Sequence, residues 1–475
     1  MRTRVLSIIL LTAVALSATS NTPMVLKTPA QFGEQATSAG TNVDPAVDKW
    51  WETFHDAQLS ALIQQAVHNN LDIKLASQRV LESKAERRIA RAALLPSINT
   101  SSSFRRIRGG FQDGYIHVDN APGGGIFVQP FESNLFQLGF DASWEIDLFG
   151  GHRHGLQAAA AEVQSSEESR RDVLLSVLGE VSRAYMDLRG AQKRLAITEM
   201  NVNLQKDSLH LAEVRAQAGL GPELDAERAR QQIASTESLI PSFEAQIAAD
   251  IHQLGVLLGE PPSTLKDRLT QSAALPENPP AVPVGLPADL LTRRPDLRRA
   301  RVDLIAAAAR VGAAKADLFP KITLTGVVGR QSTSLSGFTL GAGNFFSVGP
   351  GITVPIFEAG RIRAHIAARK QQLEQAQTHY QSVLLQALRE TEDALCNYGR
   401  EQERRQKLVA AVEASTISED MAKDLYAHGL TDFLSVLDAQ RERLLNQDAL
   451  AQNDTAIRSD LVALYKSLGG GWLVE

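Results

Sequence analysis

Residues 90–96 read ARAALLP and residues 314–320 read AKADLFP, and each stretch is followed at once by residues of alternating polarity. Further along, DLFGGHR at residues 147–153 corresponds to PIFEAGR at residues 355–361. The offset is 224 residues for the first pair (314 minus 90) and 208 for the second (355 minus 147). The chain is therefore a duplicated unit, and the two copies differ in length inside the alternating segment.

The alternating segment of the first copy predicts a β-strand, because its side chains repeat with a period of two. The apolar face would carry Phe136, Leu138, Phe140, Ala142, Trp144 and Ile146, and the polar face Gln137, Asp141, Ser143, Glu145 and Asp147. The preceding strand, at residues 98–104, has a weaker pattern and is rich in serine. The second copy repeats the design with Ile322, Leu324 and Val328, then Phe346, Val348, Ile352 and Val354. Each copy thus contains one β-hairpin, with a long loop at residues 109–125 or 332–343.

Two long proline-free segments, residues 156–218 and 363–428, predict long helices. Apolar residues recur in the first at spacings of three and four, which is a coiled-coil pattern: Leu174, Val177, Val181, Ala184, Leu188, Ala191 and Leu195. A helix of about 60 residues extends about 90 Å. Each ends at a glycine-containing turn, residues 219–222 or 429–432, after which a returning helix is expected. Leu437, Leu444 and Ala451 continue the pattern beyond the second turn.

The composition and the first residues restrict the possible structural class and cellular location of the protein. Of 475 residues only 5% are aromatic and 22% are charged, which is typical of long helices. Arg2 and Arg4, an apolar run at residues 5–16 and small residues to position 20 predict a signal peptide over residues 1–20. The alternative is a membrane anchor, for which the run is short. The net charge of −5, with no basic run carrying aromatics, argues against a nucleic-acid partner.

The predicted strands have no covering layer, and this indicates an oligomeric membrane sheet. Unpaired edge groups in lipid cost several kcal/mol each, so an open sheet must be completed by other copies. Two copies would give a filled barrel, and three copies, with twelve strands, would leave a lumen. The alternatives left open are a sandwich strand with one face in water and a soluble coiled-coil scaffold.

The duplication divides the chain at a proline-rich stretch. After the signal peptide, the predicted organisation is a first repeat at residues 21–265, with its β-hairpin at about 96–147, a linker at 266–287, and a second repeat at 288–475, with its β-hairpin at about 320–356. The linker prolines predict an extended connector. The single cysteine, Cys396, excludes an intrachain disulfide and is expected to be a small buried apolar residue.

Several motifs, taken together and in this order, resemble one family. They are Trp50-Trp51 with Leu59 and Leu62, RRPDL at residues 293–297, GLTD at 429–432 with VLDAQR at 436–441, and LGGGW at 468–472. The chain resembles the outer membrane factor family of TolC-like channels, particularly the branch that serves resistance-nodulation-division efflux pumps. The resemblance covers nearly everything after the signal peptide.

The resemblance implies a mainly α-helical fold with a membrane β-barrel: a homotrimer with a twelve-stranded outer-membrane barrel on a long periplasmic α-helical barrel. It implies an exit channel that passively conducts small toxic compounds, with outer-membrane lipid around it and with a periplasmic adaptor and an inner-membrane transporter as partners. The alternative within the family is a channel for type I polypeptide secretion. We expect no enzymatic activity, cofactor or metal.

Many relatives in this branch carry a lipid-modified cysteine just after the signal peptide. Here no cysteine precedes Cys396. We therefore expect no lipid anchor and an unmodified mature N-terminus near residues 18–21.

The resemblance also suggests where the periplasmic end is closed. The matching positions are Leu434, Asp438 and Arg441, whose spacings of four and three predict one helix face. In a trimer, the leucines would form an apolar constriction and the aspartates an acidic ring, with the arginines pairing between or within subunits. Ser435 stands where other channels have a second acidic residue. The alternative is an ordinary solvated ion pair.

Contact with an adaptor is expected at the two helical turns, residues 218–223 and 428–433. The residues expected to make it are Gly219, Leu220, Gly429 and Leu430.

Other candidates for chemistry are weak. Asp113, His117 and Asp119 lie in a predicted loop, where solvation explains them better than a metal site. His152 and His154 form an isolated HxH pattern, which is a weak zinc signal, and five scattered methionines form no copper-binding cluster. No nucleophile set or nucleotide-binding loop occurs in a suitable context.

Overall fold

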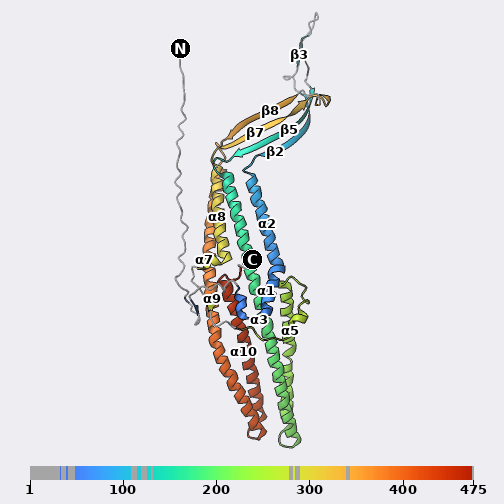
Figure 1. Cartoon of the computed structure of the whole chain (residues 1–475), viewed down its shortest axis with the longest axis vertical. Helices are drawn as coiled ribbons and strands as arrows, with labels where there is room; N and C mark the ends of the chain where they lie inside the picture. The colour runs from blue at the N-terminus through green and yellow to red at the C-terminus, as the bar shows by residue number, and fades with distance from the viewer. Residues whose placement is uncertain are drawn as a thin grey trace.

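The computed structural model describes the chain over residues 33, 39–40, 49–108, 115–118, 126–129, 132–277, 282–283, 289–338 and 343–472. Within these residues the fold is a long bundle of helices with one β-sheet at its end (Figure 1). The predicted signal peptide, the predicted mature N-terminus, Asp113 and Asp119 lie outside the described residues.

Two helix–hairpin–helix units follow one another along the chain. The first contains η2 (Trp50–Phe54), α1 (Ala57–Asn69), α2 (Leu71–Ala92), β2 (Ser97–Arg108), β5 (Glu132–Ile146), α3 (Gly151–Gln217), α4 (Glu223–Glu237) and α5 (Ile240–Leu257). The second contains α7 (Leu290–Arg293), α8 (Pro295–Ala316), β7 (Lys321–Ser332), η4 (Ser336–Phe338), β8 (Asn344–Thr353), α9 (Arg361–Ala427) and α10 (Phe433–Ser467). A short helix, α6 (Lys266–Leu269), lies at the start of the predicted linker.

The sheet joins the two hairpins in the antiparallel order β2-β5-β7-β8. The central pairing sets Phe140 opposite Val328 and Trp144 opposite Leu324. Because directly paired residues project to the same side, the register gathers most of the large apolar residues of the four strands on one face. The face assignment predicted from the alternation is confirmed for β5, although Asp147 lies just beyond the strand.

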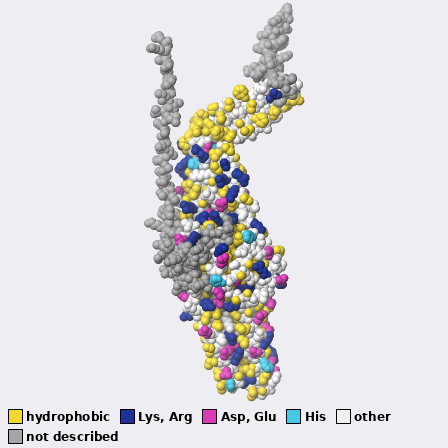
Figure 2. Space-filling view, in the orientation of Figure 1, with side chains coloured by type: hydrophobic (Ala, Val, Ile, Leu, Met, Phe, Trp, Pro, Cys, Tyr) yellow, Lys and Arg dark blue, Asp and Glu magenta, His cyan; other side chains and the backbone are white. Residues whose placement is uncertain are grey.

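The apolar face of the sheet is exposed to its surroundings in the single chain. Phe346 is 81% exposed and Val348 is 70% exposed. Apolar side chains dominate the visible surface at this end of the molecule, whereas charged side chains are spread over the helical part (Figure 2). A contiguous exposed apolar surface of this kind marks a region that is covered in the functional state.

Two details of the strands differ from the prediction. Strand β2 extends over Ser97–Arg108, beyond the predicted residues 98–104. Short strands also occur outside the four-stranded sheet: β3 (Tyr115–Val118) pairs with β4 (Ile126–Gln129), and β1 (Ala39–Gly40) pairs with β6 (Val282–Pro283). His117 therefore lies in a strand rather than in a loop.

The long helices α3 and α9 confirm the two predicted segments, and both contain 67 residues, which corresponds to about 100 Å. Each begins after a glycine with positive φ, Gly150 at 78° and Gly360 at 84°, and is followed by another, Gly219 at 71° or Gly429 at 76°. A left-handed conformation favours glycine, so these residues fix both ends of the helices.

The returning limbs of the two copies differ. In the second copy α10 is continuous, whereas in the first copy the limb breaks between α4 and α5 at Ser238 and Leu239. Pro241 occupies the first turn of α5, where its missing N–H is tolerated. This break was not predicted from the sequence.

The main core lies midway along the molecule, where the motifs quoted above meet. Trp50 stacks on Tyr465 with ring centroids 5.4 Å apart. Trp472 donates a hydrogen bond from Nε1 to the carbonyl of Arg293 (2.8 Å). The guanidinium groups of Arg171 and Arg298 both contact its ring, at 5.0 and 4.9 Å from the ring centre. The N-terminal, central and C-terminal motifs therefore form one structural unit.

Arg294 is a buried charged residue of this unit. Its guanidinium pairs with Asp296 (2.6 Å) and Glu390 (2.8 Å) and donates to the carbonyl of Ser467 (3.2 Å). Its side chain is only 9% exposed, so these partners compensate a desolvated charge.

Two further results concern the helical part. Cys396 is only partly buried, so the prediction of a buried apolar residue was wrong. Among the described residues, none of the helices combines the length and the apolar character needed to cross a membrane.

Candidate functional site

The end of the molecule far from the sheet is formed by two helical turns, one from each copy (Figure 1). The N–H of Leu220 donates to the carbonyl of Arg215, and the N–H of Leu430 donates to that of Leu425, both at 2.8 Å. The two turns thus close in the same way. Their leucines are exposed, Leu220 by 67% and Leu430 by 74%. These leucines are accessible to a partner.

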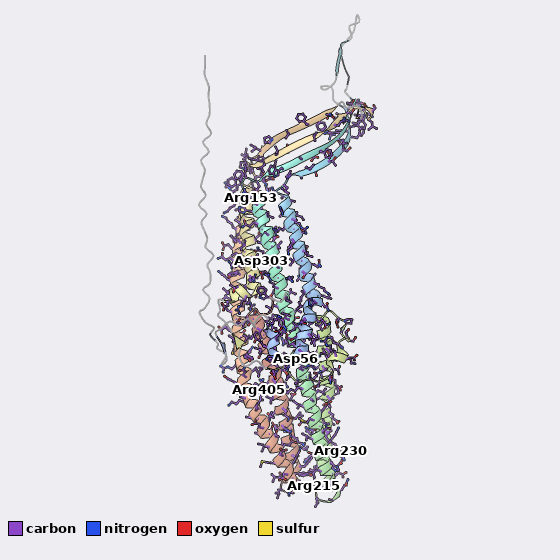
Figure 3. The ribbon with its side chains drawn as sticks, in the orientation of Figure 1. Asp56, Arg153, Arg215, Arg230, Asp303 and Arg405 are labelled. Atoms are coloured by element: carbon purple, nitrogen blue, oxygen red, sulfur yellow. The ribbon has the colours of Figure 1, made fainter. Side chains whose placement is uncertain are left out.

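One arginine connects the two turns. Arg215, at the lower end of α3 (Figure 3), donates from Nη1 to the carbonyl of Ala427 (2.7 Å), and its guanidinium lies 4.9 Å from the ring centre of Tyr426. Tyr426 donates in turn to Asp225 on α4 (3.3 Å). Burial, together with the adjacent Asp225 carboxylate, raises the pKa of the Tyr426 hydroxyl. Tyr426 is therefore a neutral donor at neutral pH.

A small apolar cluster supports this connection. It contains Ala212, Ala229, Tyr426, Phe433 and Val436, and so draws on both helical hairpins. The rings of Tyr426 and Phe433 lie 4.9 Å apart. The tip is thus held by packing as well as by polar contacts.

Asp432 fixes the start of α10. Its side chain accepts hydrogen bonds from the N–H (3.0 Å) and the hydroxyl (2.7 Å) of Ser435. These bonds hold the pKa of Asp432 below its usual value. Asp432 is therefore the N-cap of α10, and Ser435, which stands where an acidic residue was considered, donates to it.

The predicted entrance residues Leu434, Asp438 and Arg441 all lie on α10, and all three are exposed. Arg441 Nη2 lies 3.2 Å from Asp438 Oδ1 in the same chain. In the single chain, Asp438 and Arg441 therefore pair with each other within one subunit. An exposed pair of this kind contributes under about 1 kcal/mol to stability, so a larger role requires other copies.

A set of buried polar residues on the lower part of α3, two of which contact α10, was missed in the sequence. On α3 these are Thr198, Asn201, Gln205 and Ser208. Asn201 donates to Gln447 and Gln440 donates to Ser208, both at 2.8 Å. The signal was present, because these residues continue the spacing of three and four after Leu195. They were overlooked because that pattern was traced through apolar residues alone.

The histidines predicted to be weak candidates lie at the other end of α3, near the sheet. His152 Nε2 is 3.4 Å from Glu145 Oε2, and His154 Nδ1 is 3.4 Å from Gln157 Oε1. In the part of the chain that the structure describes, no group of three or more His, Cys, Asp or Glu side chains could hold a metal ion.

The sequence matches the family model described as outer membrane efflux protein over residues 62–260 and 286–470. The toluene efflux pump outer membrane protein TtgI of Pseudomonas putida is 33% identical over 439 residues, covering 91% of this chain and 90% of the relative. The probable efflux pump outer membrane protein SepC of Pseudomonas putida is 32% identical over 484 residues, covering 99% and 98%. The solved structure of the outer-membrane channel OprN superimposes with a TM-score of 0.85 at 34% identity, covering 94% of this chain and 98% of that chain.

Proposed function

Because the chain belongs to the outer membrane efflux protein family and is an outer-membrane exit channel of an efflux system, we propose that three copies complete one duct. Each copy would contribute its four strands to a barrel of twelve (three times four) in the outer membrane. The α-helices would continue the duct through the periplasm.

The observation that carries this proposal is the open amphipathic sheet. Within the described residues, the outer strands β2 and β8 each pair on one side only. In lipid, the free edge groups would cost several kcal/mol each, so β2 of one copy must pair with β8 of the next. The apolar face then meets lipid, and the polar face lines the lumen. Two copies would give only a minimal barrel, filled by its own side chains.

Each chain would contribute two similar repeats to the wall of the duct. We propose a first repeat at residues 21–265, a linker at 266–287 and a second repeat at 288–475. The separate matches of the family model to residues 62–260 and 286–470 support this division. The family consists of transport channels, and we assign no catalytic step, cofactor or metal to the chain.

The names of the relatives support a proposal about the cargo and the partners. TtgI is described as part of a toluene efflux pump, and SepC as part of a probable efflux pump. We propose that this channel passes small toxic compounds received from an inner-membrane transporter of the resistance-nodulation-division type. A periplasmic adaptor would bind the turns at Gly219, Leu220, Gly429 and Leu430, where the two leucines are exposed.

The assembly is tested by native mass spectrometry of the protein purified in mild detergent, combined with conductance in planar bilayers. We expect a complex of three chains that conducts ions. A conducting species containing a single chain would contradict the proposal, since one sheet cannot close on itself.

The entrance residues Leu434, Asp438 and Arg441 are proposed to close the periplasmic end of the duct. Around a threefold axis, the exposed leucines would meet as an apolar constriction, which resists wetting. The Asp438–Arg441 pairs would then lie beside it, close to those of the neighbouring chains. Ion pairs that are weak in one exposed chain become stronger when three of them form a network with less access to water.

Replacement of both Asp438 and Arg441 with alanine is expected to raise single-channel conductance in planar bilayers at least about twofold, because it removes the ion pairs beside the constriction. The matched control is alanine in place of Arg400 and Glu403, an exposed pair on α9 at 3.1 Å. Conductance equal to wild type in the Asp438/Arg441 variant would refute the gate.

A further inference from the structure

The contact between α3 and α10 changes character along its length. Toward the middle of the molecule, the buried residues of α3 are largely apolar, as at Leu174, Val181 and Leu188. Toward the tip, most of the buried residues are polar, namely Thr198, Asn201, Gln205 and Ser208, although Val202 and Ala212 are buried there too. We call this lower part the polar seam. Polar residues at the buried positions of a coiled coil reduce its stability and single out particular arrangements.

Gln205 is the least satisfied member of the polar seam. Its side chain belongs to a residue only 3% exposed, and neither its Oε1 nor its Nε2 has a hydrogen-bond partner among the described residues. The Oε1 of Gln440, on the facing helix, is also buried without a partner. Unsatisfied buried amides destabilise the arrangement that buries them. A shift of α10 that exposed them to water would therefore recover free energy.

The surrounding contacts restrict such a shift to the lower part of α10. The helix is joined to α9 by Arg443, which pairs at 2.6 Å with the buried Glu419, so α9 and α10 move together. Above the polar seam, Arg194 on α3 holds Asp448 on α10 at 2.6 Å. Below it, the connection depends on the tip contacts of Arg215 and Tyr426. The polar seam is thus a weak segment between two stronger attachments.

We propose that Gln205 and Gln440 are positioning residues for the entrance: they penalise the packed arrangement seen here, so that the lower part of α10 can move away from α3. That movement carries the entrance residues outward, because Leu434, Asp438 and Arg441 lie on the same helix. The inference rests on the proposed gate and adds the contact that sets how readily the gate opens.

The test replaces Gln205 with leucine, a side chain of similar size that favours burial. We expect single-channel conductance to fall at least about threefold, because leucine removes the cost of the packed arrangement. We also expect the thermal unfolding temperature to stay equal or to rise. The matched control is Ser182→Ala, which removes a different buried polar group, a hydroxyl without a partner among the described residues, higher on α3. This variant should leave conductance unchanged.

Combination with the gate variant separates the two ideas. Conductance is compared in wild type, Asp438→Ala/Arg441→Ala, Gln205→Leu and the triple variant. If the gate variant conducts more and Gln205→Leu reverses that gain, both ideas are supported. If the gate variant conducts like wild type but Gln205→Leu still lowers conductance, the gate assignment fails and the role of the polar seam stands. If Gln205→Leu leaves conductance unchanged in both backgrounds while the protein unfolds at a higher temperature, Gln205 is merely structural and the inference is overturned.

Discussion

Arginine in place of Val348 is expected to remove the assembled channel from the outer membrane, whereas arginine in place of Ser347 is expected to be tolerated. The two residues are adjacent in β8, but pairing with Gly326 and Val327 places them on opposite faces of the sheet. An arginine on the lipid face near the bilayer centre costs about 2–4 kcal/mol in each chain, and the cost is repeated in every copy. An arginine on the lumen face remains in water.

The measurement is the amount of trimer in the outer-membrane fraction, by native electrophoresis, for both variants expressed at the same level. The design is matched, because the two changes introduce the same side chain one residue apart. Equal loss of both variants would mean that neither face borders water. Equal tolerance would mean that the apolar face does not border lipid, and the proposed orientation of the sheet would be wrong.

Alanine in place of Arg294 is expected to lower the free energy of unfolding by about 1.5–3 kcal/mol, because the partly exposed Asp296 and Glu390 lose charge-assisted hydrogen bonds to its guanidinium. The carbonyl of Ser467 at the end of α10 also loses a donor. The effect should therefore reach the C-terminal segment, which packs on the same unit through Trp472.

Thermal unfolding followed by circular dichroism and by tryptophan fluorescence measures this effect. Arg293→Ala is the control, since Arg293 contributes to the unit through its backbone carbonyl, which alanine retains. A loss of stability that is equal in the two variants would show that the paired guanidinium of Arg294 has no special role.

The strands and the long helices were predictable because their signals are local. The alternation from Phe136 to Ile146 identifies a strand and its two faces without knowledge of any partner. Gly219 and Gly429 mark the helix ends, because the left-handed conformation there suits glycine. Strand β2 was predicted too short, because serines give no contrast between its faces. Its extent is set instead by pairing along the whole of β5.

The features that were missed depend on contacts between distant parts of the chain. Nothing near Trp472 in the sequence indicates that its ring contacts Arg171 and Arg298. The RRPDL and LGGGW motifs supported the family resemblance, but their physical role as one buried unit appears only in three dimensions. The connection of Arg215 to Ala427 likewise spans the two copies.

The entrance residues were predicted in part from the sequence and in part were not. The spacing of Leu434, Asp438 and Arg441 was enough to place them on one helix. The single chain contains the Asp438–Arg441 ion pair within a subunit, and pairing between subunits stays a prediction. The burial of Cys396 was predicted wrongly. A helical pattern shows on which face of the helix a residue lies, but not how far a neighbouring helix covers that face.

The equal length of α3 and α9 limits how this architecture can change in evolution. Both helices run from the sheet to tips that are tied to each other, so an insertion in one alone would break the tie. Growth or shrinkage must occur in both repeats at once, and the returning limbs must change with them. Seven residues, two helical turns, keep the packing phase and alter the reach by about 10 Å. Relatives that span periplasms of different depth should therefore differ by concerted steps of this size.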